Sequence, residues 1–434
     1  MISYDEALAL IHCSIKQSSL IERSTETLSL DKTLGKVAAR QVNSPIQSPP
    51  FRNSAMDGFA VCSSHLKEAS PLTPVILSVT ASIAAGDASI ATGNNLAILS
   101  KEGTVQIMTG APVPLPFDAV VPIEKATQEK NRYATFTHPV LPGEHVRMPG
   151  EDVAQGECVL KVGSCITPEH IMLLSSLGIT SLEVAKTPLI RVISTGNEIT
   201  DDYSSPLKEG QIYNANAPYL MAALRRQGLQ GIYDGMIEDD ACLFEEKIAS
   251  LNPNQIIIST GAVSKGIWDF IPHSLEKLGA TIHFHRVNIR PGKPILFATL
   301  PNGSFYFGLP GNPISAAIGF NFFIMPLIRT LQGLEVEQPI NARLTHSFTK
   351  KSDFRQFLKS TLSVNEKGVL MVDISQGQES FKIHPLAKSN AWVVLDENTT
   401  QWQEGDCVTV YPYFNLMNSL ANPPNLDHKP ERMH

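Results

Sequence analysis

Apolar and polar positions follow two different periods along this chain, and the places where the period changes divide it into regions. Ser3 and Glu6 form a capping box just before the apolar positions of ALALIHCSI. These positions recur at helical spacing, which predicts an amphipathic helix. A second helix is predicted over residues 29–42, after which the prolines between residues 45 and 50 break the pattern.

Short β-branched segments separated by glycine and proline turns occupy residues 47–146. This pattern is typical of a small all-β unit, either a barrel or a sandwich. Helical signals return at Thr167, where an N-cap is followed by proline and an acid, and they continue to Gly178. We therefore expect a discontinuous helical linker domain, residues 1–46 and 147–186, with the β unit of residues 47–146 inserted into it.

From residue 187 to residue 335, apolar strand patterns such as LIRVIS and QIIIST alternate with amphipathic helical segments. Such alternation predicts an α/β domain with a mostly parallel sheet and helices on both faces. Short strands return over residues 336–418 and predict a C-terminal β-barrel-like domain, and residues 419–434 are predicted to be a flexible tail. The predicted fold class is therefore multidomain α/β plus β.

Composition narrows the possible functions. The 434 residues suggest two to four domains, and the formal net charge of −7 argues against a nucleic-acid-binding surface. The six cysteines are scattered without zinc-site spacing, as expected for reduced thiols in a cytoplasmic protein. The longest apolar tract, residues 316–328, is shorter than the ~20 residues that span a bilayer, so we expect a buried helix there and no membrane segment.

Three predicted strands of the α/β domain end in loops rich in glycine and small polar residues: residues 192–198, 256–266 and 306–313. Ligands of open α/β sheets bind beyond the carboxyl ends of the strands, and such loops present backbone N–H groups to anions. We therefore predict an anion pocket here, with ordinary tight turns as the alternative. Neither a P-loop nor a GxGxxG sequence is present, which argues against a dinucleotide site.

Charged residues beside these loops add to the prediction. Glu198, Asp239 and Asp269 are carboxylates near the loops and could hold Mg²⁺, although acids at helix starts also act as caps. Arg290 and Lys293 lie in a turn stiffened by proline, where rigid cations suit a phosphate or oxyanion. A solvated hairpin tip is the alternative for this pair of cations.

The first β unit carries Asp57 in NSAMDGFAV, Thr109 in MTGAPVP and an acidic turn, GED, at residues 150–152. Together with STGNE, the GAVSKG segment, RPGKP and GLPGNP, these segments occur in the order found in molybdopterin molybdenumtransferases. The chain thus resembles the MoeA family, which includes the gephyrin E domain, over residues 3–415. The resemblance implies insertion of molybdate into adenylylated molybdopterin, with Mg²⁺-dependent hydrolysis that releases AMP.

The resemblance also implies a set of site residues and partners. The family is an elongated homodimer, and its active site lies between the α/β domain of one subunit and the first two domains of the other. A molybdopterin adenylyltransferase and molybdoenzyme delivery proteins are the further partners that it implies. The implied catalytic residues are Asp57, Thr109, Glu198, Asp239 and Asp269, of which the last three are the implied Mg²⁺ ligands; the implied binding residues are Lys293, Pro310, Pro313 and Arg355. The strand-end loops and the proline turn add the predicted binding residues Ser194, Thr195, Gly196, Gly261, Ser264, Arg290 and Gly311.

This chain departs from the family pattern at three of its positions. Asn197 replaces the acid of TGDE, Ala262 replaces a glycine of GGVS, and Arg290 stands where many members have lysine. Two other functions remain as alternatives. A molybdopterin adenylyltransferase would share the α/β domain, but it would lack the flanking domains and Asp57. A non-catalytic scaffold like the gephyrin E domain would have no need of the retained acids.

Overall fold

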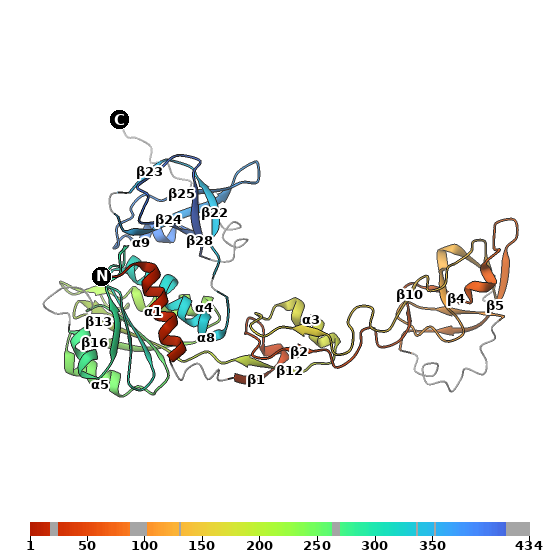
Figure 1. The fold of residues 1–434 in the computed structure, drawn as a ribbon, viewed down its shortest axis with the longest axis horizontal. Coiled ribbons are helices and arrows are strands. Elements are labelled where there is room, and N and C mark those ends of the chain that lie inside the picture. The colour runs from red at the N-terminus through yellow and green to blue at the C-terminus, as the bar shows by residue number, and fades with distance from the viewer. Residues whose placement is uncertain are drawn as a thin grey trace. The chain divides into compact units, whose positions relative to one another are not determined.

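The computed structural model describes residues 1–17, 25–86, 102–129, 132–262, 270–335, 337–350 and 353–413. Contacts divide the chain into two compact units. Unit 1 comprises Met1–Glu26, Gly35–Ala39 and Glu183–His434, and unit 2 comprises Thr27–Leu34 and Arg40–Leu182. Each unit is described by itself, with the element labels of Figure 1.

The central sheet of unit 1 has the strand order β16-β13-β17-β21-β20-β18. β13 pairs in parallel with both β16 and β17, β17 pairs in parallel with β21, and β20 is antiparallel to both of its neighbours. The prediction of a mostly parallel sheet is confirmed. The strands are β13 (Ile190–Thr195), β16 (Gly231–Ile237), β17 (Ile256–Thr260), β18 (Thr281–His285), β20 (Leu296–Thr299) and β21 (Phe305–Leu309), with the short pair β14 (Ile199–Thr200) and β15 (Ile212–Tyr213) beside them.

Helices cover both faces of this sheet because successive side chains of a strand point to opposite sides. Ile190 and Val192 of β13 pack with one group of helices, and Ile193 packs with the other. The first group is α1 (Tyr4–Gln17), α4 (Asn216–Arg226) and the long helix formed by α7 (Pro313–Gly319), η6 (Phe320–Ile324) and α8 (Met325–Gln332); the second group is α5 (Ala241–Ala249) and α6 (Ile271–Lys277).

The long helix over Pro313–Gln332 is the one described segment with the length and hydropathy of a membrane-spanning helix. However, 72% of its most apolar window is buried inside the protein, where it packs against the sheet and α1. The buried helix predicted from the tract at residues 316–328 is therefore confirmed. Its apolar composition is that of a core helix.

The C-terminal part of unit 1 is a closed β-barrel, as predicted. β24 (Arg355–Val364) pairs with both β25 (Leu370–Ile374) and β26 (Ala391–Leu395), and β22 (Ile340–Leu344) and β28 (Cys407–Pro412) complete the ring. β19 (Ile289–Arg290) extends from the α/β part and pairs in parallel with β24. The remaining elements are β23 (Phe348–Thr349), β27 (Gln401–Trp402) and α9 (Ile383–Ala387).

Unit 2 contains the predicted all-β insertion. Its sheet has the order β7-β4-β6-β5-β9-β8, and it is made of β4 (Gly58–Val61), β5 (Val75–Ile83), β6 (Thr104–Ile107), β7 (Ala119–Pro122), β8 (Ala126–Glu129) and β9 (Tyr133–Phe136). The predicted helix after Thr167 is also present as α3 (Pro168–Ser176), with Thr167 in a capping box. Shorter elements are β2 (Val42–Asn43), β3 (Asn53–Ser54), β10 (Val146–Arg147), β11 (Cys158–Leu160), η3 (Ser63–Leu66) and η5 (Ile123–Lys125).

The helix predicted over residues 29–42 is wrong. That stretch holds the end of β1 (Thr25–Ser29), a single 3₁₀ turn, η2 (Leu30–Lys32), and extended backbone. Gly35 has φ +73°, a left-handed conformation that terminates helices. Residues 37–39 instead hydrogen-bond to residues 183–185 of β12 (Ser181–Ala185). Helix α1 also packs on the α/β sheet, so the contacts group it with unit 1 and not with residues 40–46.

Candidate functional site

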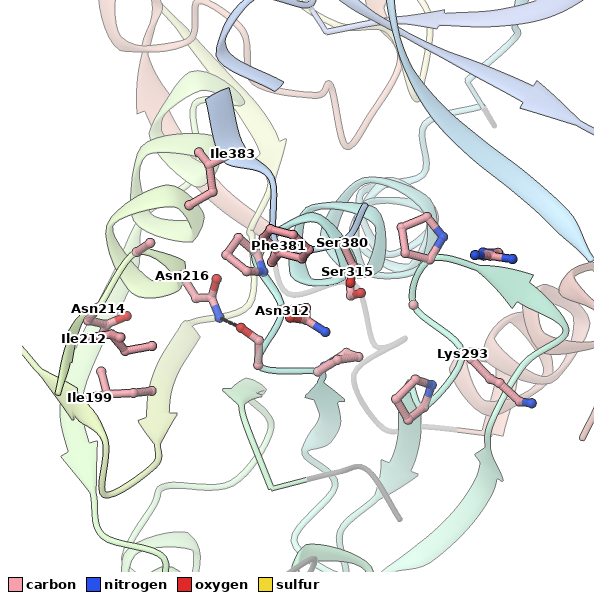
Figure 2. A pocket seen from close by; sticks show the side chains of 18 of the residues that line it. Ile199, Ile212, Asn214, Asn216, Lys293, Asn312, Ser315, Ser380, Phe381 and Ile383 are labelled. Carbon is pink, nitrogen blue, oxygen red and sulfur yellow. Dashed lines mark hydrogen bonds between the residues drawn. The ribbon is translucent and has the colours of Figure 1, made fainter. Parts of the chain in front are cut away.

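A cavity of about 890 Å³ lies at the carboxyl edge of the unit 1 sheet (Figure 2). The loops after β13 and β21 form part of its wall, and the turn after β19 forms another part. In Figure 2, Lys293 lies on the opposite side of the cavity from Ile199, Ile212 and Asn214. This is the edge at which open α/β sheets bind ligands.

The three glycine-containing loops meet at this edge, as predicted. The N–H of Gly261 donates to the carbonyl of Leu309 at 3.0 Å. A Cβ atom on Gly261 would lie 2.3 Å from the carbonyl oxygen of Thr195, and a Cβ on Gly311 would lie 3.9 Å from the Cα of Gly261. Gly261 also has φ +103°, which side chains rarely allow. Glycine is therefore required at position 261 because the backbones touch.

Ser194 and Thr195 end β13, and both are buried. Ser194 Oγ accepts a hydrogen bond from Asn214 Nδ2 at 2.9 Å, and Thr195 Oγ1 donates to the carbonyl of Thr260 at 3.1 Å. Their hydroxyls thus hold the strand ends together and do not line the cavity. Gly196 and Gly261 likewise do not line the cavity. Gly261 allows two loops to approach closely, whereas a Cβ on Gly196 would meet the Glu198 side chain of its own loop, 2.8 Å from Oε2.

Six of the predicted site residues line the cavity, and they include both cations. The carboxylate of Glu198 is exposed, and the Nζ of Lys293 lies 5.2 Å from the ring centroid of Phe354, within cation–π range. Positive charge and a carboxylate therefore share one cavity, which suits a ligand that carries phosphate or an oxyanion. The six residues are Glu198, Arg290, Lys293, Pro310, Gly311 and Pro313.

Asn214 connects the elements around the cavity, although no pattern in the sequence marked it as a site residue. It is 3% exposed, and its Nδ2 contacts both Ser194 Oγ and Asp201 Oδ1. Its Oδ1 accepts a hydrogen bond from the N–H of Ala217 in the first turn of α4. Tyr233 OH donates to Asp201 Oδ2 at 2.6 Å, and burial together with this bond raises the pKa of Tyr233. An Asn placed just before a helical pattern was the available signal for a capping residue.

Asn216 joins the start of α4 to the loop after β21. Its Nδ2 donates to the carbonyl of Gly311 at 2.8 Å, which is the dashed line in Figure 2. Asn197 performs a similar function between two other strand ends, because its Oδ1 accepts the N–H of Asp239 at 3.0 Å. An aspartate at position 197 could accept the same bond, so the departure from the family pattern preserves this contact.

The predicted metal ligands occupy different positions. Glu198 lines the cavity, Asp239 is half-buried outside the cavity wall, and Asp269 lies outside the described residues, as does Ser264. In the described part of the chain, no three His, Cys, Asp or Glu residues cluster as a metal site. Mg²⁺ commonly uses one or two protein carboxylates together with water and substrate phosphates. Among the predicted ligands that lie in the described residues, Glu198 alone lines the cavity, and it supplies one such carboxylate.

Unit 2 brings Asp57 and Thr109 together, although they are far apart in sequence. Asp57 precedes β4 and Thr109 follows β6, and these strands are antiparallel neighbours with Gly58 opposite Ile107. The N–H and Oγ1 of Thr109 both donate to Asp57 Oδ1, at 2.6 and 2.8 Å. These two hydrogen bonds lower the pKa of the exposed Asp57 carboxyl.

Arg355, predicted to bind the ligand, lies outside the cavity of Figure 2. Its guanidinium makes a bidentate pair with Asp5 at 2.8 and 3.0 Å, and its Nε donates to Glu397 at 2.9 Å. It also lies 4.8 Å from the ring centroid of Tyr4. These contacts connect α1 to β24 within unit 1, and a role in ligand binding stays a prediction.

Comparisons with known proteins account for nearly the whole chain. Residues 2–178 match the MoeA N-terminal region (domain I and II), residues 191–330 a probable molybdopterin binding domain, and residues 341–413 the MoeA C-terminal region (domain IV). Molybdopterin molybdenumtransferases of Synechococcus elongatus and Haemophilus influenzae are each 34% identical, and each match covers 91% of this chain and 95% of the relative. The chain belongs to the MoeA family of molybdopterin molybdenumtransferases.

Solved structures agree with this membership. A molybdopterin biosynthesis MoeA protein of Pyrococcus horikoshii aligns with a TM-score of 0.77 at 25% identity, over 95% of this chain and 100% of the other. As a MoeA family member, the protein is a transferase of molybdenum cofactor biosynthesis. The region matched by the molybdopterin binding domain contains the strand-end loops that form the cavity.

Proposed function

We propose that this protein inserts molybdenum from molybdate into molybdopterin, with adenylylated molybdopterin as the substrate and AMP as a product. The observation that carries the proposal is the cavity at the strand ends. Arg290, Lys293 and Glu198 line it, and all three lie in the region matched by a molybdopterin binding domain. The sulfurs that receive molybdenum belong to the pterin. The protein therefore needs no cysteine cluster at the site.

The residues of this chain supply binding and orientation. Lys293 and Arg290 are cations that offset the negative charge of phosphate and molybdate oxygens. Loop N–H groups at the strand ends add further donors for these oxygens. Hydrolysis of the phosphoanhydride by water leaves AMP and the terminal phosphate of molybdopterin, so the site must orient that water and stabilise the separating charges.

We also propose that Glu198, together with Asp239 or Asp269, holds Mg²⁺ against the substrate phosphates. When bound, the ion neutralises charge on the phosphoanhydride. The hydrogen bonds from Thr109 lower the pKa of Asp57, so its carboxylate stays ionised and can accept a hydrogen bond from the substrate. These roles rest on the family resemblance and on the chemistry of the groups.

The direct test mixes purified protein with adenylylated molybdopterin, molybdate and Mg²⁺, and measures AMP by chromatography. We expect AMP release that depends on molybdate and stops when EDTA removes the metal. Absence of AMP release from correctly folded protein would contradict the proposal. Formation of adenylylated molybdopterin from ATP would instead favour the adenylyltransferase alternative, and inactivity combined with tight binding of another protein would favour the scaffold.

We further propose that the protein acts as a cytoplasmic homodimer in which Asp57 of the partner subunit serves the cavity of the first. A molybdopterin adenylyltransferase would supply its substrate, and molybdoenzyme delivery proteins would take its product. Mixing two variants that should each be inactive tests the shared site: Asp57→Asn, and Glu198→Gln, which removes the proposed Mg²⁺ ligand of the cavity. Random re-association makes half of the dimers mixed, each with one intact site, so about a quarter of wild-type activity should return. No recovery from dimers shown to exchange subunits would contradict the shared site.

A further inference from the structure

Lys359 is a charged residue that is buried completely, with 0% of its surface exposed. It lies on β24, and its Nζ donates to the carbonyls of Gly377 at 2.7 Å, Glu379 at 3.2 Å and Lys382 at 3.2 Å. The three ammonium protons therefore have three acceptors, all on the loop of residues 375–382 between β25 and α9. Burial lowers the pKa of Lys359, as expected for an ammonium removed from water.

The same loop is attached to Lys359 by its backbone. Gln378 Oε1 accepts the N–H of Lys359 at 3.0 Å, and Gln378 Nε2 donates to the Lys359 carbonyl at 2.8 Å. The N–H of Ser375 donates to that carbonyl as well, at 3.0 Å. Gly377 has φ +77°, and a Cβ there would lie 3.1 Å from Pro385 Cγ, so the loop is tightly folded. Lys359 thus makes hydrogen bonds with residues from Ser375 to Lys382, along the length of this loop.

This loop leads directly to the cavity. Ser380 and Phe381 line it, and the carbonyl of Ser380 accepts the N–H of Ile314 in the first turn of α7. Figure 2 shows Ser380 and Phe381 beside Ser315. The Phe381 side chain is 64% exposed, although it is large and apolar. An exposed aromatic ring at a cavity wall is well suited to stack on a flat heterocycle.

Barrel stability alone does not require this arrangement. β24 pairs with β25 and β26 through its own backbone, and these pairings do not involve the Lys359 side chain. A buried ammonium is costly, and an apolar residue of similar volume is often as stable or more stable. All hydrogen bonds of the Lys359 side chain go to the loop. Its buried ammonium therefore stabilises one defined conformation of the loop.

We propose that Lys359 is a positioning residue for substrate binding, which holds the 375–382 loop so that Phe381 forms a stacking platform for a flat heterocycle. The proposal rests on the proposed function, because adenylylated molybdopterin carries two such rings, the adenine and the pterin. Phe381 contacts the substrate directly, whereas Lys359 acts through the loop.

Amide hydrogen exchange tests the clamp without any substrate. In Lys359→Met, the hydrogen-bonded amides that depend on this loop, those of Ile314, Ser375 and Lys382, should exchange at least ~10-fold faster, while those of β24 and β26 stay protected. Lys367→Met is the matched control, because Lys367 is exposed in the β24–β25 turn of the same barrel, and it should leave exchange unchanged. If Lys359→Met does not fold, Gln378→Ala removes the side-chain bonds to Lys359 and should show the same loop effect. Unchanged loop exchange in the variant that folds would overturn the proposal.

Binding and kinetics test the platform. Phe381→Ala and Lys359→Met should each weaken binding of AMP or of a free pterin about 10-fold, and the affected probe identifies the stacked ring. KM should rise about 10-fold with kcat nearly unchanged, as expected for lost binding contacts. The double variant should bind each probe no more weakly than Phe381→Ala does, because both substitutions remove the same contact, the stacking on Phe381. Wild-type affinity of both probes in Lys359→Met would refute the platform, whereas failure of the wild type to release AMP would refute only the proposed function.

Discussion

The cavity of unit 1 and the Asp57–Thr109 pair of unit 2 present charge in different ways. In unit 1, Arg290 and Lys293 come from the end of β19 and the turn after it, Glu198 comes from the loop after β13, and all three line one cavity of about 890 Å³. In unit 2, a single exposed carboxylate is held by both donors of Thr109. The first region is built to surround a ligand with several contacts. The second fixes one acid in one orientation, which suits a group that acts on a reacting atom.

This difference predicts that substitutions in unit 2 mainly lower kcat, whereas substitutions in the cavity of unit 1 mainly raise KM. The decrease in kcat is the largest effect that we expect. Asp57→Asn should lower kcat by ~100-fold or more with little change in KM, because it removes a charge that does not enclose the ligand. Lys293→Met should mainly raise KM, by about 10-fold, because it removes a charged contact in the cavity. Steady-state AMP release measures both variants. Similar KM effects for the two would show that the two regions do not differ in this way.

The next largest effect concerns the stability of the loops at the cavity edge. Gly261→Ala should lower the free energy of unfolding by roughly 2–4 kcal/mol, because the new Cβ meets the Thr195 carbonyl in a left-handed conformation. Thermal unfolding measures the change. Gly35→Ala is the matched control, since Gly35 also has φ +73° but has open space around it. Equal losses in both variants would show that conformation, and not loop contact, sets the requirement.

A smaller effect concerns the pH dependence of the unit 2 carboxylate. The bonds from Thr109 lower the pKa of Asp57, so the ionised form persists to lower pH than in a free aspartate. Thr109→Val removes the Oγ1 donor and keeps the N–H, so the pKa of Asp57 should rise toward its ordinary value. The acidic limb of the kcat profile should then move to higher pH, and carboxyl NMR would report the same shift. An unchanged pH profile of kcat would show that the Asp57 carboxyl is not the group whose titration limits the reaction.

The smallest effect is expected at Asn197. Asn197→Asp restores the acid common in the family and keeps an acceptor for the N–H of Asp239. Activity should stay within about 3-fold of wild type, a difference of less than ~0.7 kcal/mol. The Mg²⁺ dependence of AMP release provides the sensitive measurement. A large gain in Mg²⁺ affinity would show that this position contributes to the metal site.

Much of the fold could be predicted from local patterns, because hydrophobic periods report which face of an element is buried. The alternation over residues 187–335 indicated the sheet, and the loops at its strand ends indicated the cavity. The helix predicted over residues 29–42 failed because pairing with residues 183–185 decides that segment, and no local pattern reports a partner so distant in sequence.

The site was predictable to the extent that residue type sets chemistry. Glu198, Arg290 and Lys293 all line the cavity, and their roles in binding and catalysis stay predictions. Ser194 and Thr195 were also expected at these loops, but their hydroxyls are occupied within the protein. Whether a polar side chain faces a ligand or a neighbouring strand depends on its burial, which is a property of the folded chain.

The sequence by itself determined the order of the elements, the glycines at strand ends and the charges available beside them, because these follow from residue type and spacing. Only the tertiary structure decided which groups meet. Asn214 joins two strands, a loop and a helix, and Lys359 serves three carbonyls of the 375–382 loop. The physical reason is that a buried polar group must find partners. The packing of the whole chain determines which partners are within reach.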